Sequence, residues 1–286
     1  MAFLLPAANI QKGRSSECGQ SFVAWDWQST IPKTATFVSS KFIHMKTFWR
    51  SLCCISVVLI CATNSSFTER KTIADPLTGA WLLESGEEQQ VLQFVDGYHT
   101  HTRYSKPAKK FTETRGGPYT INGNKLNILV EFDTKNTDET GQTLSKDFSL
   151  KNDELTFTTN GRAFTFKRID NGTAPLAGLW SITGRMQDGK MTPIHRTGTR
   201  KTIKILSGTR FQWAAIDPGT KQFSGTGGGT YEFANGKYTE HIEFFSRDSS
   251  RVGASLTFDG KLENGEWHHS GLSSKGDKIY EVWSMK

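Results

Sequence analysis

The heptapeptide DPLTGAW at residues 75–81 recurs as APLAGLW at residues 174–180. Both copies keep a Pro-Leu pair and end in a Gly-x-Trp, at Trp81 and Trp180. Self-similarity of this kind indicates an internal repeat, because repeated units keep the turn and core residues of their common fold. At 286 residues the chain is long enough for two domains, each with its own core. We therefore expect two related domains in tandem.

Further matches between the two copies share a single offset of 112 residues. They are KKF at 109–111 with KQF at 221–223, GGPY at 116–119 with GGTY at 228–231, and VEF at 130–132 with IEF at 242–244. Since Trp81 and Trp180 are only 99 residues apart, the second copy must contain an insertion of about 13 residues. We place it most simply near residues 185–199, where it could form a rim loop or lid.

Turn signals punctuate both copies at short intervals. Asp-Gly and Asn-Gly dipeptides begin at residues 96, 122, 160, 235, 259 and 264. These dipeptides supply the positive φ angles of tight hairpin turns, and the runs between them are rich in aromatic and β-branched residues. Seven to nine strands per copy must deal with exposed sheet edges, which closure into a barrel removes. The sequence predicts an all-β protein of two tandem antiparallel β-barrels, at residues 75–170 and 175–286.

The first part of the chain has the pattern of an export signal. Residues 45–65 contain a basic start, an apolar run of about a dozen residues and a small polar end, which is typical of a secretory signal peptide. We interpret residues 1–44 as an upstream extension or a mis-assigned start. All four cysteines lie at or before Cys61, so the two expected barrels contain none. A secreted or periplasmic protein is expected, with lipid attachment at Cys61 left open as a membrane anchor.

The basic balance of the chain does not indicate nucleic-acid binding. The formal net charge is +7, but residues 1–73 contribute +5 of it, from eight Lys or Arg and three Asp or Glu. The remainder is nearly neutral and has no evident basic cluster of the kind that binds nucleic acid. No partner other than a small-molecule ligand is predicted, and no cofactor or metal.

Both Gly-x-Trp motifs resemble the first strand of lipocalins and other calycins, in which the Trp closes one end of the barrel. GTGGGTY at 225–231, IEFFSRD at 242–248 and WHHSG at 267–271 are similar to an uncharacterised lipocalin-like family of secreted Bacteroidetes proteins. This resemblance covers residues 176–286. It implies a lipocalin-like barrel and export, and no established activity.

Strand alternation sorts the polar residues of 237–245 by face. Tyr238, Glu240, Ile242 and Phe244 are expected on one face, with Thr239, His241, Glu243 and Phe245 on the other. A Glu that faces inward needs a cationic partner. Arg247 and Arg251 are candidates for this role or for binding an anionic ligand at a barrel mouth. The alternative is a solvated loop with a local pair between Asp248 and an arginine.

Histidines offer two further candidates. His268 and His269 are neighbours on one strand, so only one can face inward, either as an acid or base or as a wall residue with a hydrogen bond. His99 and His101 share a face with Arg103, which predicts an exposed polar face rather than a metal site. Neither pair has the spacing of a complete metal site.

Residues confined to the second copy are the better candidates for a specific site. We therefore predict a small-molecule binding protein with its site in the second barrel, with apolar walls that include Trp283 and Phe244. The candidate ligand-binding residues are Trp213, Tyr231, His241, Glu243, Arg247, Arg251, His268 and His269. One alternative is a hydrolase or isomerase that uses Glu243 with His268 or His269, and another is a structural or protein-interaction module. The ligand and the oligomeric state stay open.

Overall fold

The computed structural model describes residues 75–195 and 197–285. The segments at 1–44 and 45–65, together with all four cysteines, lie outside the described residues. The predictions of an upstream extension, a signal peptide and a lipid anchor at Cys61 therefore concern residues on which the structure is silent.

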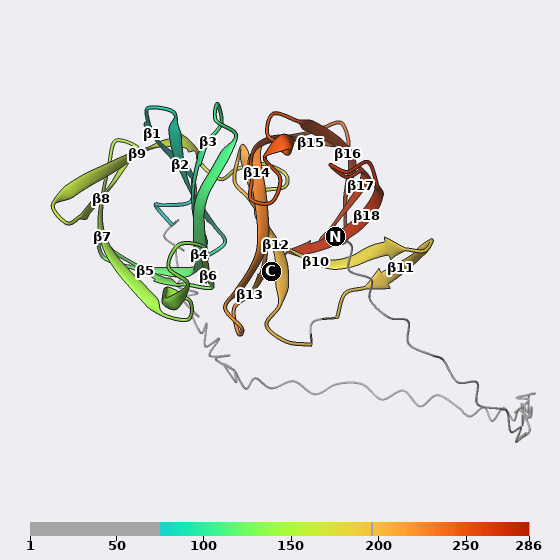
Figure 1. Ribbon diagram of the computed structural model, residues 1–286, viewed down its shortest axis with the longest axis horizontal. Helices are drawn as coiled ribbons and strands as arrows, with labels where there is room; N and C mark the ends of the chain where they lie inside the picture. Colours follow the sequence, from blue (N-terminus) through green and yellow to red (C-terminus); the bar gives the residue numbers. More distant parts are fainter. Residues whose placement is uncertain (1–74, 196, 286) are drawn as a thin grey trace, which may run out of the picture. The chain divides into compact units, whose positions relative to one another are not determined.

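The first copy is a closed antiparallel barrel. Residues 75–170 form nine strands and one short 3₁₀ helix: β1 (Gly79–Ser85), β2 (Glu88–Val95), β3 (Tyr98–Ser105), β4 (Lys110–Asn122), β5 (Lys125–Leu129), β6 (Phe132–Asp133), the 3₁₀ helix (Thr137–Glu139), β7 (Thr143–Lys151), β8 (Glu154–Thr159) and β9 (Arg162–Asp170). Eight of them close into a ring in the order β1-β2-β3-β4-β5-β7-β8-β9, and β6 adds to β4. Figure 1 shows this ring.

The second copy repeats the arrangement. Its described residues form nine strands and one 3₁₀ helix: β10 (Gly178–Gln187), β11 (Lys190–Pro193), β12 (Lys201–Leu206), β13 (Arg210–Asp217), β14 (Gln222–Ala234), β15 (Lys237–Phe245), the 3₁₀ helix (Ser249–Arg251), β16 (Ser255–Glu263), β17 (Glu266–Leu272) and β18 (Lys278–Met285). The ring runs β10-β12-β13-β14-β15-β16-β17-β18 and closes between β10 and β18. The prediction of two tandem antiparallel barrels is confirmed.

An extra hairpin accounts for the insertion in the second copy. The end of β10 and the short strand β11 pair with each other, from Gly184 with Pro193 to Gln187 with Lys190. The first copy has no counterpart between β1 and β2, which are joined by a tight turn. The hairpin lies within the segment near 185–199 that the unequal offsets indicate, and it contributes no residue to a barrel cavity.

The repeated tryptophans make the same local contact in each barrel. The indole N–H of Trp81 donates to the backbone oxygen of Leu77 at 2.8 Å, and that of Trp180 donates to Leu176 at 2.9 Å. Both indoles are fully buried among the apolar residues of their own barrel. In the first barrel the guanidinium of Arg168 lies 4.0 Å from the Trp81 ring. The same local contact thus anchors the first strand in both copies.

A β-bulge lies at the centre of each repeat. In the second copy Gly228 pairs with Phe244 and Gly229 pairs with Ile242, so Glu243 is the extra residue of β15. In the first copy the counterpart of Glu243 is Glu131, which lies between β5 and β6. Bulges bend a strand and redirect its side chains.

The bulge corrects the predicted faces of 237–245. Tyr238, Glu240 and Ile242 face the barrel interior as a set. Beyond the bulge, Phe244 packs outside the barrel and Phe245 lines the interior. The expectation that Phe244 forms a wall of the ligand pocket is therefore wrong, because alternation holds only where no extra residue interrupts the strand.

The two bulged glutamates lie where the barrels meet. Glu131 accepts a hydrogen bond from Tyr98 of its own barrel at 2.6 Å and one from Lys201 of the second barrel at 2.6 Å. Glu243 accepts hydrogen bonds from Arg210 of its own barrel and from Tyr104 of the first barrel. Each glutamate thus binds one group of its own barrel and one group of the other barrel.

Aromatic pairs beside the glutamates show that this contact is reciprocal. Phe132 of the first barrel stacks with Phe223 of the second, with centroids 6.1 Å apart. Phe244 of the second barrel stacks with Phe111 of the first at 6.3 Å. Each residue and its counterpart are 112 positions apart, so the two pairs are equivalent with the barrels exchanged. Reciprocal contacts of this kind define a two-fold interface, here between two halves of one chain.

We predict that Gly229→Ala destabilises the second barrel. A Cβ at Gly229 would overlap the backbone carbonyl oxygen of His241, which cannot move away because it belongs to the adjacent strand. Overpacking at such a site lowers the free energy of unfolding by about 2–3 kcal/mol, which urea denaturation measures. Gly198→Ala is the control, since a Cβ there meets nothing within 4 Å. Equal stabilities of the two variants would contradict the prediction.

Candidate functional site

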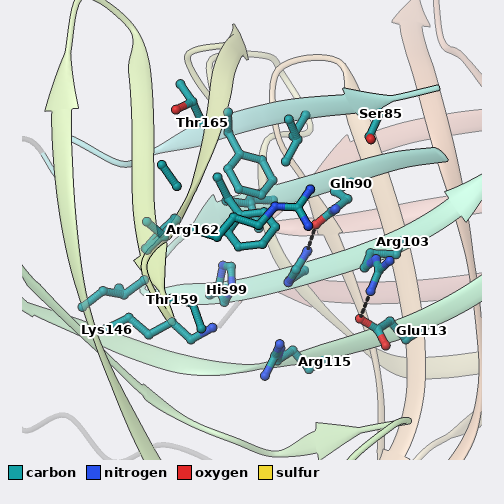
Figure 2. A pocket seen from close by; sticks show the side chains of 18 of the residues that line it. Ser85, Gln90, His99, Arg103, Glu113, Arg115, Lys146, Thr159, Arg162 and Thr165 are labelled. Atoms are coloured by element: carbon teal, nitrogen blue, oxygen red, sulfur yellow. Dashed lines mark hydrogen bonds and ion pairs between the residues drawn. The ribbon is translucent and has the colours of Figure 1, made fainter. Parts of the chain in front are cut away.

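The larger cavity lies in the lumen of the first barrel and has a volume of about 660 Å³. Alternation along β3 directs His99, His101 and Arg103 inward. Arg115 on the adjacent strand β4 and Lys146 on β7, which follows β5 in the ring, point into the same space. Figure 2 shows His99, Arg103, Arg115 and Lys146 around the cavity. Part of the wall is apolar, and its members include Leu92, Leu126, Ile128, Leu144, Phe157, Phe164 and Phe166.

One of the cations in this cavity is neutralised within the barrel wall. Arg103 donates to Glu88 at 2.7 Å and to Glu113 at 3.0 Å, and Lys135 lies 3.4 Å from Glu113. The carboxylates of Glu88 and Glu113 therefore pair with two cations, Arg103 and Lys135. This network holds the side chains of β2, β3 and β4 in place at the mouth of the barrel.

Two other cations are less well paired. The guanidinium of Arg115 lies 3.6 Å from Asp133 and 3.5 Å from Glu139, beyond ordinary hydrogen-bond distances. No carboxylate of the described residues lies within 4.0 Å of the Lys146 ammonium. Burial lowers the pKa of Lys146, and the charge of Arg115 lowers it further. Arg115 thus forms two long ion pairs, whereas Lys146 is a lumen cation without a carboxylate at salt-bridge distance among the described residues.

The two histidines of β3 are buried in this positive environment. Burial, followed by the charges of Arg115 and Lys146, lowers the pKa of His99 to about 3. The pKa of His101 is lowered from the same causes. Nδ1 of His99 lies 3.3 Å from the backbone oxygen of Gln93. Since a carbonyl only accepts, Nδ1 carries the proton of a neutral ring and Nε2 is an acceptor.

The prediction of an exposed polar face for His99 and His101 is wrong. His99 is 4% exposed, and both rings line the lumen. The shared face with Arg103 was correct, but the sequence pattern does not say which face of a strand is inside a barrel. A polar face at the core of a domain is unusual, and here it marks a cavity. We name Arg115, Lys146, His99 and His101 the basic cluster.

The second barrel has a smaller cavity, of about 290 Å³. Two of the eight predicted ligand-binding residues line it, Trp213 and His269, together with the expected wall residue Trp283. Tyr231 lies in the apolar core of the same barrel, where its hydroxyl donates to the backbone oxygen of Ser207 at 2.7 Å. The remaining predicted residues do not line this cavity.

Four of those residues make local contacts. Nδ1 of His241 lies 2.7 Å from the hydroxyl of Ser255, and Nδ1 of His268 lies 3.0 Å from the hydroxyl of Tyr280. Arg247 donates to the backbone oxygen of Ser224. Arg251 donates to Asp248 at 2.9 Å, which is the local pair of the solvated-loop alternative. Neither arginine pairs with an inward-facing glutamate.

Glu243 belongs to the contact between barrels. Its partners among the described residues are Arg210, Tyr104 and, at 3.3 Å, Lys106. It contacts neither His268 nor His269, so the acid–base pair of the predicted enzyme is not assembled. The inward glutamate of β15 is Glu240, whose cationic partner is Lys204 at 2.9 Å.

Equivalent wall positions carry different chemistry in the two barrels. The residues of the basic cluster in the first barrel have aromatic or glycine counterparts 112 positions later: Phe211 for His99, Trp213 for His101, Gly227 for Arg115 and Phe258 for Lys146. Aromatic side chains fill part of the second lumen, since a Cβ at Gly227 would contact the rings of Trp213 and Phe245. This substitution explains the smaller cavity.

Residues 75–195 and 197–285 contain no group of three or more His, Cys, Asp or Glu side chains placed to hold a metal ion. In the same ranges, no helix is long and apolar enough to cross a membrane.

Comparison with known proteins adds no family. No protein-family profile matches the chain, and no curated protein is similar to it in sequence. Among solved structures, the β subunit of DNA polymerase III from Thermotoga maritima has a TM-score of 0.14 at 8% identity, with 76% of this chain and 79% of that chain covered. The corresponding subunit from Pseudomonas aeruginosa has a TM-score of 0.13 at 8% identity, with 73% and 78% covered.

We predict that Glu243→Gln reduces stability at neutral pH and that the loss disappears in acid. Burial raises the pKa of Glu243, but Arg210 and the hydrogen bond from Tyr104 outweigh it and lower the pKa below its ordinary value. A lowered pKa contributes stability that is present above the unfolded pKa and lost as the pH falls through the folded pKa. Since Arg210 would stay buried without its partner, the cost at pH 7 is about 3 kcal/mol.

Urea denaturation between pH 7 and pH 3 measures this difference. The gap between the free energies of unfolding of wild type and Glu243→Gln should begin to narrow near pH 4, where unfolded carboxyl groups protonate, and should close as the pH falls further through the lowered pKa of folded Glu243. Glu232→Gln, an exposed glutamate on β14, is the matched control and should follow wild type throughout. A constant gap between wild type and Glu243→Gln would show that the carboxylate charge is not the cause.

Proposed function

We propose that the protein binds a small organic anion in the lumen of its first barrel. The observation that carries the proposal is a cavity of about 660 Å³ lined by both apolar side chains and the basic cluster. Ligand pockets commonly have volumes of about 300–1,000 Å³ and combine an apolar wall with a few polar groups that orient the ligand. This keeps the ligand-binding function expected from the sequence and moves the principal site from the second barrel to the first.

The charges of the cavity favour an anion. Five cations line it, Arg103, Arg115, Lys135, Lys146 and Arg162, against three carboxylates, Glu84, Glu88 and Glu113. Asp133 and Glu139 lie outside this lining, 3.6 and 3.5 Å from Arg115. Arg115 and Lys146 lack a carboxylate at hydrogen-bond distance among the described residues. A carboxylate, sulfonate or phosphate group of a ligand would supply one. Arginine binds such groups in a planar, bidentate geometry.

The histidines support the same ligand class. Positive charge and burial keep His99 and His101 neutral, so neither competes with a ligand for negative charge at neutral pH. An anion that binds next to them would offset the charges of Arg115 and Lys146 and raise both pKa values. The apolar part of the wall, which includes Phe157 and Phe166, would contact a hydrocarbon part of the ligand.

The two alternatives expected from the sequence have less support. An enzyme that uses Glu243 with His268 or His269 lacks the required contact, because Glu243 is held by Arg210 and Tyr104 at the contact between barrels. A purely structural module would not need an open cavity lined by incompletely paired cations. Buried charge without a partner costs free energy, which a bound anion would recover.

We predict that Lys146→Gln weakens binding of an anionic dye and spares a neutral one. The probes are 8-anilinonaphthalene-1-sulfonate and its uncharged analogue N-phenyl-1-naphthylamine, titrated by fluorescence. Loss of one charge-assisted hydrogen bond, about 1.5–3 kcal/mol, weakens the sulfonate by roughly tenfold or more. The neutral probe should bind equally to both proteins.

Lys151→Gln is the control, since Lys151 lies on the same strand, β7, with an exposed side chain. It should leave the binding of both dyes unchanged. Equal sulfonate affinity of wild type and Lys146→Gln would overturn the proposal, and so would an equal loss in the control. If both dyes bind saturably but do not compete with each other, they occupy different sites.

We also propose that the barrels are exported to the periplasm or the cell exterior. The support is the signal-like segment at 45–65, which lies outside the described residues. N-terminal sequencing of the protein from producing cells should show a mature chain that begins close to residue 65. A lipid-modified N-terminus at Cys61, seen by mass spectrometry, would indicate the anchored form, and an N-terminus before residue 45 would refute export.

A further inference from the structure

The second lumen has its own chemistry. Its cavity of about 290 Å³ lies near the lower end of the range for small-molecule pockets, about 300–1,000 Å³. The walls are largely aromatic: Phe211, Trp213, Phe245, Phe258 and Trp283 line it. The ionisable side chains of the lining are Lys204, Glu240, His269 and Glu281. This combination suits a small molecule that aromatic faces attract.

Lys204 shows that the interior already stabilises an ammonium group. Its side chain is buried, and Nζ lies 2.9 Å from Glu240. The same nitrogen lies 5.0–5.2 Å from the ring centroids of Tyr238, Trp267 and Trp283. Aromatic faces attract cations at such distances. Because Lys204 and Glu240 neutralise each other, the charge of the lumen depends on the remaining carboxylate.

That carboxylate, Glu281, has no cationic partner among the described residues. It accepts a hydrogen bond from the indole of Trp283 at 3.1 Å, and its other close contact is Nδ1 of His269 at 3.4 Å. Burial raises the pKa of Glu281, but His269 and the charge of Lys204 outweigh it and lower the pKa, so the group is ionised. Burial, followed by the charge of Lys204, lowers the pKa of His269 and keeps the ring neutral.

His269 is also incompletely satisfied. It is 2% exposed, and neither ring nitrogen has a hydrogen-bond partner among the described residues. Its contact with Glu281 is close in distance but lacks hydrogen-bond geometry. A buried polar group without a partner costs about 1–3 kcal/mol. The ring lines the cavity, so a ligand in the lumen is within its reach.

We propose that the lumen of the second barrel is a separate site for a small organic ammonium ion, such as a primary or secondary amine. Glu281 neutralises the ammonium, and the unprotonated ring nitrogen of His269 accepts a hydrogen bond from one of the ammonium N–H groups. Trp213, Phe245 and Trp283 contact its alkyl part through their ring faces. The site differs in sign from the anion site of the first barrel and does not depend on it.

Isothermal titration calorimetry of the full chain tests the proposal with n-butylammonium chloride and its neutral counterpart n-butanol at matched ionic strength. The ammonium should show saturable binding at least tenfold tighter than that of the alcohol. Glu281→Gln keeps the size of the side chain and removes its charge. It should weaken butylammonium at least tenfold and leave butanol unchanged.

Two variants serve as controls. Glu263→Gln removes an exposed carboxylate from β16, and Lys151→Gln removes an exposed lysine from the first barrel; both should bind butylammonium like wild type. Trp213→Leu removes one aromatic side chain from the wall and leaves Glu281 in place, and it should weaken butylammonium binding several-fold. This variant provides the test if circular dichroism shows that Glu281→Gln does not fold. Absence of saturable butylammonium binding to wild type, or butanol binding as tightly, would overturn the proposal.

Discussion

A carbonyl oxygen packed directly against a glycine is the constraint on which this structure depends. In the first barrel the backbone oxygen of Leu129 occupies the space of a Cβ at Gly117, and in the second that of His241 occupies it at Gly229. Only glycine permits so close an approach of two strands. The extra residue that follows in each copy is a glutamate, and the bulge directs it away from the lumen.

The position of these glutamates explains why the two barrels meet as they do. Each glutamate binds one group of its own barrel and one of the other, with Lys201 beside Glu131 and Tyr104 beside Glu243. The flanking aromatic pairs are equivalent under exchange of the barrels. A two-fold contact within one chain is the arrangement expected if two copies of a single-barrel dimer became fused. The glutamates and phenylalanines that both copies keep at these positions therefore serve the interface.

The outer faces of β3, β4, β13 and β14 form part of this contact, whereas the inner faces carry different side chains in the two barrels. The first lumen has histidines and cations where the second has aromatic rings, as at His101 and Trp213. At another position the first barrel has an apolar residue where the second has a cation, since Leu92 corresponds to Lys204. One fold with one interface thus contains two lumens of opposite character. Their ligands are expected to differ accordingly.

Much of the fold could be predicted from the chain, but the site could not. The repeated heptapeptide and the turn dipeptides identify two meanders of short strands. The pattern His99, His101 and Arg103 correctly predicts one shared face. It does not show that this face is the lumen, because both sides of a strand alternate in the same way. Residues unique to the second copy, such as Arg247 and His268, were predicted for the site but make local contacts.

Local sequence by itself therefore determined the strands, the turns and the tandem arrangement, because these depend on backbone preferences and on contacts between near neighbours. Only the tertiary structure decided which faces are inside, where each carboxylate finds its cation and which barrel stays open. Some of those features depend on side chains more than 100 residues apart, as between Tyr104 and Glu243. They also depend on a single extra residue in β15 that reverses the faces beyond it, which alternation alone does not reveal.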